Sequence, residues 1–399
     1  MLDQTHDSAA LANPEAVERA AALIPALRDR AGETERQRRI PAQSLAALRA
    51  ADLMRLLQPR RFGGDEGDFR QFVALAATLA RGCGSTGWFW SLTAICQWML
   101  ALFPLAAQED VWGENADAIV EAVIAPSAAA ERCEGGYRIA GRWNFASGCD
   151  HADWLLAGVL LPGAARPEPG FLLLPRCDFR IEHNWYTVGL AGTGSKDIVI
   201  DGAFVPAHRM VSFAALSSGA APGTAAHPAP LYRLPFMTVI PMAIAAPALG
   251  IAEDALADFL AMARGRLTKG AAAGGGGKMA EFGSVQSRVA EAQGLVDAAR
   301  LLLLRDIEDA LRAVASGAAL DLDRRIRNRR GHALAVKFCV EAVNLLYAAT
   351  GASGLFLANR LQRAWRDVNS IAKHIGVNWD AVGVMAGQHA LGLEPKGQY

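Results

Sequence analysis

Three short runs of the 399-residue chain carry residue types that could take part in chemistry. The first, "WNFASG", places Trp143, Phe145 and Ser147 at alternate positions, as on one face of a β-strand. Two aromatic rings and a hydroxyl on one face suit a flat heteroaromatic ligand, because the rings stack and the hydroxyl bonds a ring heteroatom. Aromatic residues at this spacing are more often core, and the strand alone favours that alternative.

The second run is a glycine-rich turn, "GLAGTGS", at residues 189–195. Its backbone N–H groups and the hydroxyls of Thr193 and Ser195 can bind an anion or a carbonyl group. Because such turns join strands in many proteins, this run by itself indicates a ligand only weakly.

The third run, "RDVNSIAKHIG", begins with the pair Arg366-Asp367 and places His374 seven residues after the aspartate. A charged pair in a helical bundle most often forms structural salt bridges that anchor the helix, and we assign it that role, with contact to a bound ligand as the alternative. His374 is a candidate base, because its unperturbed pKa lies near ~6.5. The alternative is a histidine on the helix surface.

Other catalytic motifs are missing from the sequence. There is no G-x-G-x-x-G after a predicted strand, no H-E-x-x-H and no G-x-S-x-G. The stretch "KGAAAGGGGK" (269–278) fails as a phosphate-binding loop, because Ala272 and Met279 stand where glycine and Ser or Thr are required. The six cysteines form no C-x-x-C pair, so neither a zinc site nor a disulfide scaffold is expected.

Charge and hydropathy narrow the class of protein. Forty basic and forty acidic side chains balance, which gives no electrostatic footprint for nucleic acid or an anionic membrane. The most apolar runs, 91–107 and 239–263, are interrupted by polar or proline residues and predict buried helices rather than membrane spans. No signal peptide is recognised, and we expect a cytoplasmic protein.

The periodicity of apolar residues divides the chain into three parts. About the first 115 residues are helical, with Asn13-Pro14 as a start signal, and short alternating runs between about 118 and 213 predict six to eight strands. Residues 216–230 predict a linker or surface loop. The helical period then returns, with helices predicted at 236–264, 281–315, 321–350 and 355–373. We predict an α+β fold with domains at 1–117, 118–215 and 216–399.

Taken in this order, "GRWNFASG", "GTGSKDIVIDGAFVPAHR" and "LQRAWRDVNSIAKH" resemble the acyl-CoA dehydrogenase superfamily. The resemblance is nearest to its two-component flavin-dependent monooxygenases, such as the hydroxyphenylacetate hydroxylase oxygenases, and covers residues 15 to 393. It implies an N-terminal helical domain, a central β-barrel or sandwich, and a C-terminal helical bundle.

The same resemblance implies an activity. A separate flavin reductase would supply reduced FMN or FADH₂, which would react with O₂ to a C4a-hydroperoxyflavin that hydroxylates an aromatic or biosynthetic small molecule. No metal is implied. A homotetramer that forms through the C-terminal bundle is expected.

The resemblance also implies roles for particular residues. Ser147 would hydrogen-bond flavin N5, Trp143 and Phe145 would wall the ring system, and Thr193 and Ser195 would contact the flavin. Further expected contacts are Arg264 and Arg266 with the flavin phosphate of a neighbouring subunit, and Ser127 with the substrate. His374 would be a substrate-facing base or hydrogen-bond partner, since its pKa suits a phenol better than a carbon acid.

Two departures from the relatives bear on the substrate. Cys96, Gln97 and Trp98 stand where many relatives carry a histidine close to the substrate, and Ala191 replaces an arginine before the "GTGS" turn. The first departure removes a charged partner and favours a larger or more apolar substrate, with these three residues as its candidate contacts.

Two other functions remain open from the sequence. One is a dehydrogenase or desaturase that keeps tightly bound FAD and uses His374 as its base. The other is a non-catalytic relative that keeps the helical scaffold for assembly.

Overall fold

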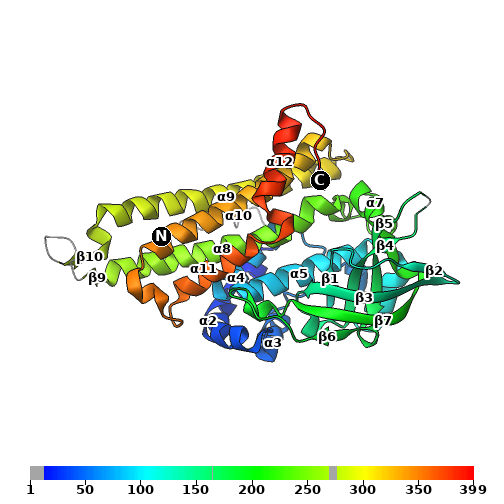
Figure 1. Ribbon diagram of the computed structural model, residues 1–399, viewed down its shortest axis with the longest axis horizontal. Helices are drawn as coiled ribbons and strands as arrows, with labels where there is room; N and C mark the ends of the chain where they lie inside the picture. Colours follow the sequence, from blue (N-terminus) through cyan, green and yellow to red (C-terminus); the bar gives the residue numbers. More distant parts are fainter. Residues whose placement is uncertain (1–12, 164, 269–275) are drawn as a thin grey trace.

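The structure, a computed structural model, describes residues 13–163, 165–268 and 276–399. Helices form its two ends along the chain and strands its middle, as Figure 1 shows, which confirms the predicted fold class. Most of the glycine-rich segment 269–278, whose composition predicts a loop, lies outside the described residues.

Within residues 13–117 the N-terminal part has five α-helices. Asn13 begins the first of them, because its side-chain oxygen accepts a hydrogen bond from Ala16 N at 3.2 Å. The helices are α2 (Pro14–Gln37), α3 (Ala42–Ala50), α4 (Phe69–Gly82), α5 (Gly84–Ala101) and α6 (Leu105–Trp112). Every residue of α5 except Leu92 is buried, so this helix is a wall between the helical part and the strands.

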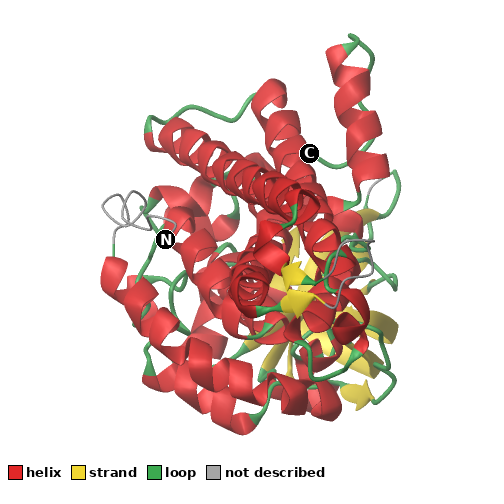
Figure 2. Cartoon of the chain, turned by 90° about the vertical axis from the view of Figure 1, so that its left-hand side faces the viewer, coloured by secondary structure: helices red, strands yellow, loops and turns green. Residues whose placement is uncertain are grey.

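The middle part is a sandwich of two four-stranded sheets (Figures 1 and 2). One has the order β1-β4-β5-β8, with β1 (Val120–Val123), β4 (Trp154–Leu161), β5 (Glu168–Pro175) and β8 (Met210–Ser212). The other has the order β2-β3-β7-β6, with β2 (Glu131–Cys133), β3 (Gly136–Ala146), β7 (Lys196–Pro206) and β6 (Arg180–Glu182). All neighbours pair antiparallel except β1 and β4. Buried side chains from both sheets share one core.

The C-terminal part contains the long helices that the periodicity predicts. Its elements are α7 (Phe213–Ser218), α8 (Phe236–Gly265), the β9–β10 ribbon (Leu267–Thr268 and Gly277–Lys278), α9 (Gly283–Ala315), α10 (Leu322–Ala348), α11 (Arg360–Ile371) and α12 (Trp379–Ala390). Helix α12 was not predicted. Helix α11 ends at Ile371, so the expectation that a helix extends to 373 is wrong, and His374 lies in the turn that follows.

Helix α8 is the central element of the molecule. It packs against α4, α5, α9, α10 and α11. By length and composition it could cross a membrane, but 94% of its most apolar window is buried within the protein, as expected for a core helix. The described strands other than the β9–β10 ribbon lie within residues 120–212, and domain boundaries at 117 and 215 remain our proposal.

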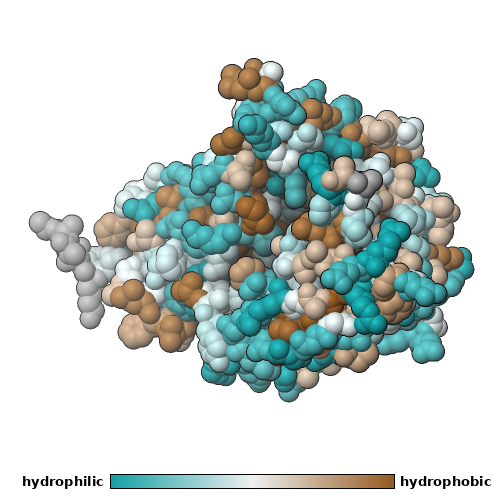
Figure 3. All heavy atoms as spheres, turned by 45° about the vertical axis from the view of Figure 1, so that its right-hand side comes forward, coloured by the Kyte–Doolittle hydropathy of each residue, from teal (hydrophilic) through white to brown (hydrophobic). Residues whose placement is uncertain are grey.

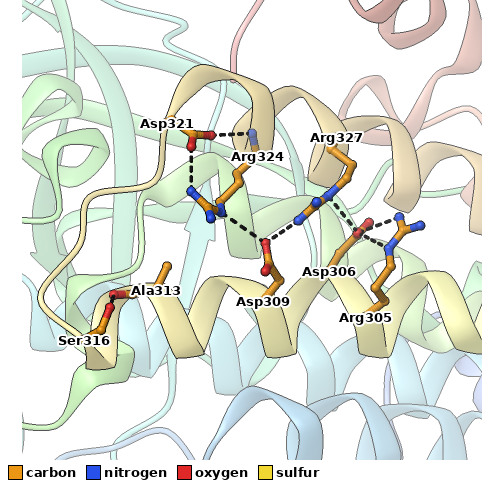
Figure 4. Close-up of polar contacts among 8 residues, drawn as sticks. All are labelled: Arg305, Asp306, Asp309, Ala313, Ser316, Asp321, Arg324 and Arg327. Atoms are coloured by element: carbon orange, nitrogen blue, oxygen red, sulfur yellow. Dashed lines mark hydrogen bonds and ion pairs between the residues drawn. The ribbon is translucent and has the colours of Figure 1, made fainter.

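Charged side chains join α9 to α10 along their exposed edge (Figure 4). Arg324 lies 2.6 Å from Asp321 and 3.3 Å from Asp309, which also pairs with Arg327. The fully buried Asp306 is bonded by Arg305 at 2.7 Å, and its burial raises its pKa to about 6. The pairs that Asp309 makes with Arg324 and Arg327 join α9 to α10.

The Arg366-Asp367 pair on α11 holds a loop of the β domain. Arg366 Nη1 donates to Val188 O at 2.6 Å and pairs with Glu35 of α2. The buried Asp367 Oδ1 accepts a hydrogen bond from Leu190 N at 2.7 Å. The predicted structural role is therefore confirmed, although Asp367 bonds a backbone N–H rather than forming a salt bridge.

Replacing Asp367 by alanine should lower the free energy of unfolding by about 1–3 kcal/mol, because it leaves the buried Leu190 N–H without an acceptor. Asp367→Asn keeps an acceptor oxygen and should cost less. Urea denaturation of both variants, with the exposed Glu291→Ala as control, measures the difference. Unfolding curves for Asp367→Ala that coincide with the wild type would contradict this role.

Candidate functional site

Three hydroxyl groups meet where the β domain packs against α5. Ser147 Oγ lies 2.6 Å from Ser195 Oγ, which lies 2.7 Å from Thr193 Oγ1. All three side chains are buried. Trp88 of α5 donates its indole N–H to Ser147 Oγ at 3.1 Å. The structure thus brings together the two runs that the sequence singled out separately.

A β-bulge gives Ser147 this position. The register between β3 and β7 shifts between Trp143 and Ala146, and Phe145 takes a positive φ of 72°. The period of two therefore breaks inside the run "WNFASG". Trp143 is fully buried in the sandwich core and donates Nε1–H to Gly158 O at 2.7 Å. The prediction that Trp143 walls a ligand is wrong, and the core alternative is correct for it.

Phe145, in contrast, is 68% exposed and meets Trp185 edge to face at a centroid distance of 6.2 Å. Tyr186 is also exposed, and the Arg38 guanidinium lies 4.3 Å from its ring centroid. A positive φ is costly for a bulky residue and is often found at ligand sites. Exposed rings beside a buried hydroxyl cluster suit a flat ring system that is apolar on its faces and polar at one edge.

His374 approaches the same cluster from the other side of Trp88. The two rings meet edge to face at 6.0 Å, and His374 Nδ1 accepts a hydrogen bond from Gly376 N at 3.0 Å. Burial, with a smaller effect of the Arg329 charge, lowers the pKa of His374 to about 4. At neutral pH the imidazole is therefore uncharged. Because Nδ1 accepts a hydrogen bond, the ring hydrogen belongs on Nε2.

Glu121 is a buried acid that sequence reasoning missed. It lies on β1 with 1% exposure, and Thr93 of α5 donates to its Oε1 at 2.6 Å. It also lies directly against the backbone of Gly148, next to Ser147, where a Cβ would come within 2.6 Å of Oε1. Burial raises its pKa well above the ordinary value of 4.5. The available signal was a single glutamate within the apolar run "AIVEAVIAP".

The three residues expected to contact the substrate from α5 do not share a face. Gln97 donates to Met54 O at 2.5 Å and Trp98 to Leu231 O at 2.9 Å, so both point into the helical core. Their assignment to the substrate site is wrong, because only every third or fourth residue of a helix faces one side. Cys96 is also buried but lies on the side of Glu121, and burial raises the pKa of its thiol well above 9.0.

Ser127, Arg264 and Arg266 are not brought to the hydroxyl cluster of the same chain. Ser127 is exposed and bonds the carbonyl of Ala125 at 3.3 Å. Arg264 is exposed, and Arg266 donates to Thr350 O at 2.6 Å and Ser353 Oγ at 2.9 Å. The two arginines lie at the end of α8 near the β9–β10 ribbon, far from the sandwich (Figure 1). Their expected contact with a neighbouring subunit's ligand stays a prediction.

Two helical parts around a two-sheet sandwich define a class of protein, that of the acyl-CoA dehydrogenase fold. Residues 18–134 match the N-terminal domain of acyl-CoA dehydrogenases, and residues 242–379 match their C-terminal domain. Among the described residues, no group of three or more His, Cys, Asp or Glu could hold a metal ion.

Relatives with assigned activities cover nearly the whole chain. The FADH₂-dependent resorcinol hydroxylase oxygenase component of Rhizobium sp. strain MTP-10005 is 46% identical over 96% of this chain and 95% of its own. The oxygenase subunit HsaA of Rhodococcus jostii RHA1 is 38% identical over 94% and 98%. The crystal structure of the 3-HSA hydroxylase from Rhodococcus sp. RHA1 superposes with a TM-score of 0.89, at 36% identity over 96% and 98%.

The chain therefore belongs to the flavin-dependent monooxygenases of the acyl-CoA dehydrogenase superfamily. It is the oxygenase component of a two-component system, an oxidoreductase that uses reduced flavin from a separate reductase. The expectations of family, enzyme class and cofactor are confirmed.

Exchanging Glu121 for glutamine should change how stability depends on pH. In the folded wild type Glu121 keeps its proton above pH 4.5, whereas the unfolded chain releases it there. The stability that Glu121 contributes at low pH is therefore lost as the pH rises from 4.5 towards its raised folded pKa. Glu121→Gln cannot ionise and loses nothing over this range. Its free energy of unfolding, relative to the wild type, should rise between pH 5 and pH 8.

Urea denaturation at both pH values measures this difference. The exposed Glu131→Gln is the matched control and should run parallel to the wild type. A difference between Glu121→Gln and wild type that is the same at both pH values would show that Glu121 is ionised in the folded protein.

Proposed function

We propose that this enzyme hydroxylates a small phenol of the resorcinol class, using O₂ and FADH₂. The observation that carries the proposal is the buried hydroxyl of Ser147 beside the exposed ring of Phe145, at the seam between the sandwich and α5. The 46% identity to a resorcinol hydroxylase supports the substrate class. The absence of a histidine at position 96 does not exclude a phenol, because the neutral His374, which meets Trp88 of the same helix, can supply a donor.

The residues present fit a flavin. Phe145 and Trp185 would cover the isoalloxazine ring, and Ser147 would hydrogen-bond its N5 atom from the buried side. When bound, the reduced flavin supplies the electrons that activate O₂ for transfer of one oxygen atom to the substrate. The protein's task is to orient the ring and exclude water, which buried, uncharged neighbours such as Trp88 and the protonated Glu121 do well.

We further propose that His374 is a hydrogen-bond donor to the substrate oxygen rather than a base. A base needs a free lone pair, but Nδ1 already accepts from Gly376 N and Nε2 carries the hydrogen. With its pKa lowered to about 4, the imidazole also holds a proton poorly at neutral pH. An Nε2–H group can stabilise a phenolate oxygen, which makes the ring carbon beside it more electron-rich. The same argument weighs against the dehydrogenase alternative, which requires His374 as base.

A homotetramer remains part of the proposal. Figure 3 shows apolar surface on the part of the molecule that projects at α12, and Val384 within this helix and Leu391 and Leu393 just after it are each more than half exposed. Exposed apolar groups of this kind mark association surfaces. Contact between subunits would also allow Arg264 and Arg266 to reach a neighbour's flavin phosphate. Light scattering that gives a monomer mass would contradict this arrangement.

Rapid mixing of the anaerobic protein and FADH₂ with oxygenated buffer tests the function directly. With resorcinol present, we expect a delay before oxidised flavin appears and a hydroxylated product that carries label from ¹⁸O₂. Ser147→Ala should shorten the delay about tenfold, the effect of one lost hydrogen bond. Ser91→Ala, which removes a buried hydroxyl bonded to Ala243 O in the helical core, is the control. Flavin oxidation at the rate of free flavin, without product from any phenol tried, would contradict the proposal.

The donor role of His374 predicts a distinct pattern of variants. His374→Gln keeps an N–H donor and should retain hydroxylation within about tenfold, whereas His374→Leu should lose substrate affinity by about tenfold or more. The KM for resorcinol reports substrate binding. The fraction of consumed O₂ that is found in the product reports how well oxygen activation is coupled to hydroxylation. If His374 were the base, glutamine and leucine would reduce the rate equally.

A further inference from the structure

The three hydroxyls of the site form a chain that ends at a fixed carbonyl. Ser147 Oγ contacts Ser195 Oγ at 2.6 Å, Ser195 Oγ contacts Thr193 Oγ1 at 2.7 Å, and Thr193 Oγ1 donates to Leu190 O at 2.8 Å. Ser147 and Ser195 are each 5% exposed and Thr193 is 1% exposed, so Thr193 is the most deeply buried of the three. The expectation that Thr193 contacts the flavin itself therefore has less support than a role through the hydroxyls of Ser195 and Ser147.

The number of available hydrogens fixes the direction of the hydrogen bonds in this hydroxyl chain. Each hydroxyl has one hydrogen, and a carbonyl such as Leu190 O can only accept. If Thr193 donates to Leu190 O, Ser195 must donate to Thr193 and Ser147 must donate to Ser195. In this direction all three hydroxyl hydrogens have acceptors, whereas the reverse direction leaves the hydrogen of Ser147 without one among the described residues. Buried hydroxyls favour the fully satisfied arrangement.

The same count determines what Ser147 offers a ligand. Its oxygen accepts one hydrogen bond from Trp88 Nε1 and donates its own hydrogen to Ser195, so one lone pair is left. Ser147 is therefore an acceptor towards the site. Reduced flavin carries a hydrogen on N5, while oxidised flavin presents a lone pair there. An acceptor at this position bonds the first and repels the second.

The end of the hydroxyl chain at Leu190 is held in place by other elements. Leu190 adopts a left-handed backbone, with φ of 52°, and its N–H is bonded to Asp367 of α11 at 2.7 Å. Trp185 Nε1 also donates to Leu190 O at 3.1 Å. The carbonyl that receives the last hydrogen therefore cannot turn away easily, and the direction of the chain is built into the fold.

We propose that Ser195 and Thr193 are positioning residues that keep Ser147 an acceptor and so make the site select reduced over oxidised flavin. This proposal rests on the proposed contact between Ser147 and flavin N5. Neither positioning residue needs to touch the flavin, because each acts through the hydroxyl in front of it.

Binding of the two redox states of FAD tests the proposal. Ser195→Ala leaves the hydrogen of Ser147 free to bond the N5 lone pair of oxidised FAD. Thr193→Val has the same result, because Ser195 then donates to Ser147. Each variant should bind oxidised FAD about tenfold more tightly, with little change for FADH₂. The midpoint potential of bound FAD should fall by about 30 mV, which is a tenfold change for a two-electron couple.

Anaerobic titrations of the flavin-free, full-length protein with FAD and with dithionite-reduced FAD measure both dissociation constants. Ser91→Ala is the matched control, and unfolding curves of every variant show whether it folds. The double variant Ser147→Ala/Ser195→Ala decides whether Ser195 acts through Ser147, because Ser195→Ala should then have no effect in the Ser147→Ala background.

The proposal and the proposed function fail in different ways. If Ser195→Ala and Thr193→Val keep the wild-type ratio of affinities while the wild type still hydroxylates resorcinol, the hydroxyl chain does not select the flavin and the function stands. An equal effect of Ser195→Ala with and without Ser147 would likewise overturn the proposal. A wild type that binds FADH₂ selectively but yields no hydroxylated phenol would instead contradict the function.

Discussion

The hydrogen bond from Leu190 N to the Asp367 carboxylate is the contact on which the rest of the site depends. It joins α11 to the β-domain turn that carries Thr193 and Ser195. Arg366 of the same helix adds a second bond to this loop through Val188 O. The turn also packs against α2 and α5 at Gly192, and the bond to Asp367 fixes its first residue from the side of the bundle. Because Asp367 is buried, its bond is worth more than a surface contact and costly to lose.

Helix α5 provides the second constraint, because its side chains link groups on both sides of the site. Trp88 donates to Ser147 and meets the ring of His374, and Thr93 donates to Glu121. Burial keeps the two titratable groups among these uncharged, with the pKa of the acid raised and that of the imidazole lowered. The inner part of the site, around Ser147, is consequently lined by groups that carry no charge at Glu121 and His374. Burial of these groups limits the entry of water there.

The sequence predicts the helices of the bundle well because their apolar period continues over many turns. The predicted helix at 281–315 is observed as α9 over Gly283–Ala315, for example. It also predicts that the runs containing Ser147 and Ser195 act together, although only through the resemblance to a family. Pattern alone placed neither run beside α5, because that depends on contacts between residues far apart in the sequence.

Other features could not be predicted, for identifiable physical reasons. The bulge at Phe145 leaves Trp143 in the core and turns Phe145 to the opposite side of the strand. No glycine or proline within residues 143–146 signals it. Gln97 and Trp98 follow Cys96 in sequence but point elsewhere. Because nearly every residue of α5 is buried, hydropathy does not indicate which of its faces meets the site. The role of Trp88 was hidden in a run of aromatic residues that resembles ordinary core.

A crystal structure of the protein with FADH₂, determined under anaerobic conditions, is the most direct test of the central claim that this seam is the flavin site. The account predicts the isoalloxazine ring against Phe145 and Trp185, with N5 within about 3.2 Å of Ser147 Oγ, an ordinary hydrogen-bond distance. A flavin bound elsewhere, or in this seam with N5 turned away from Ser147, would contradict it.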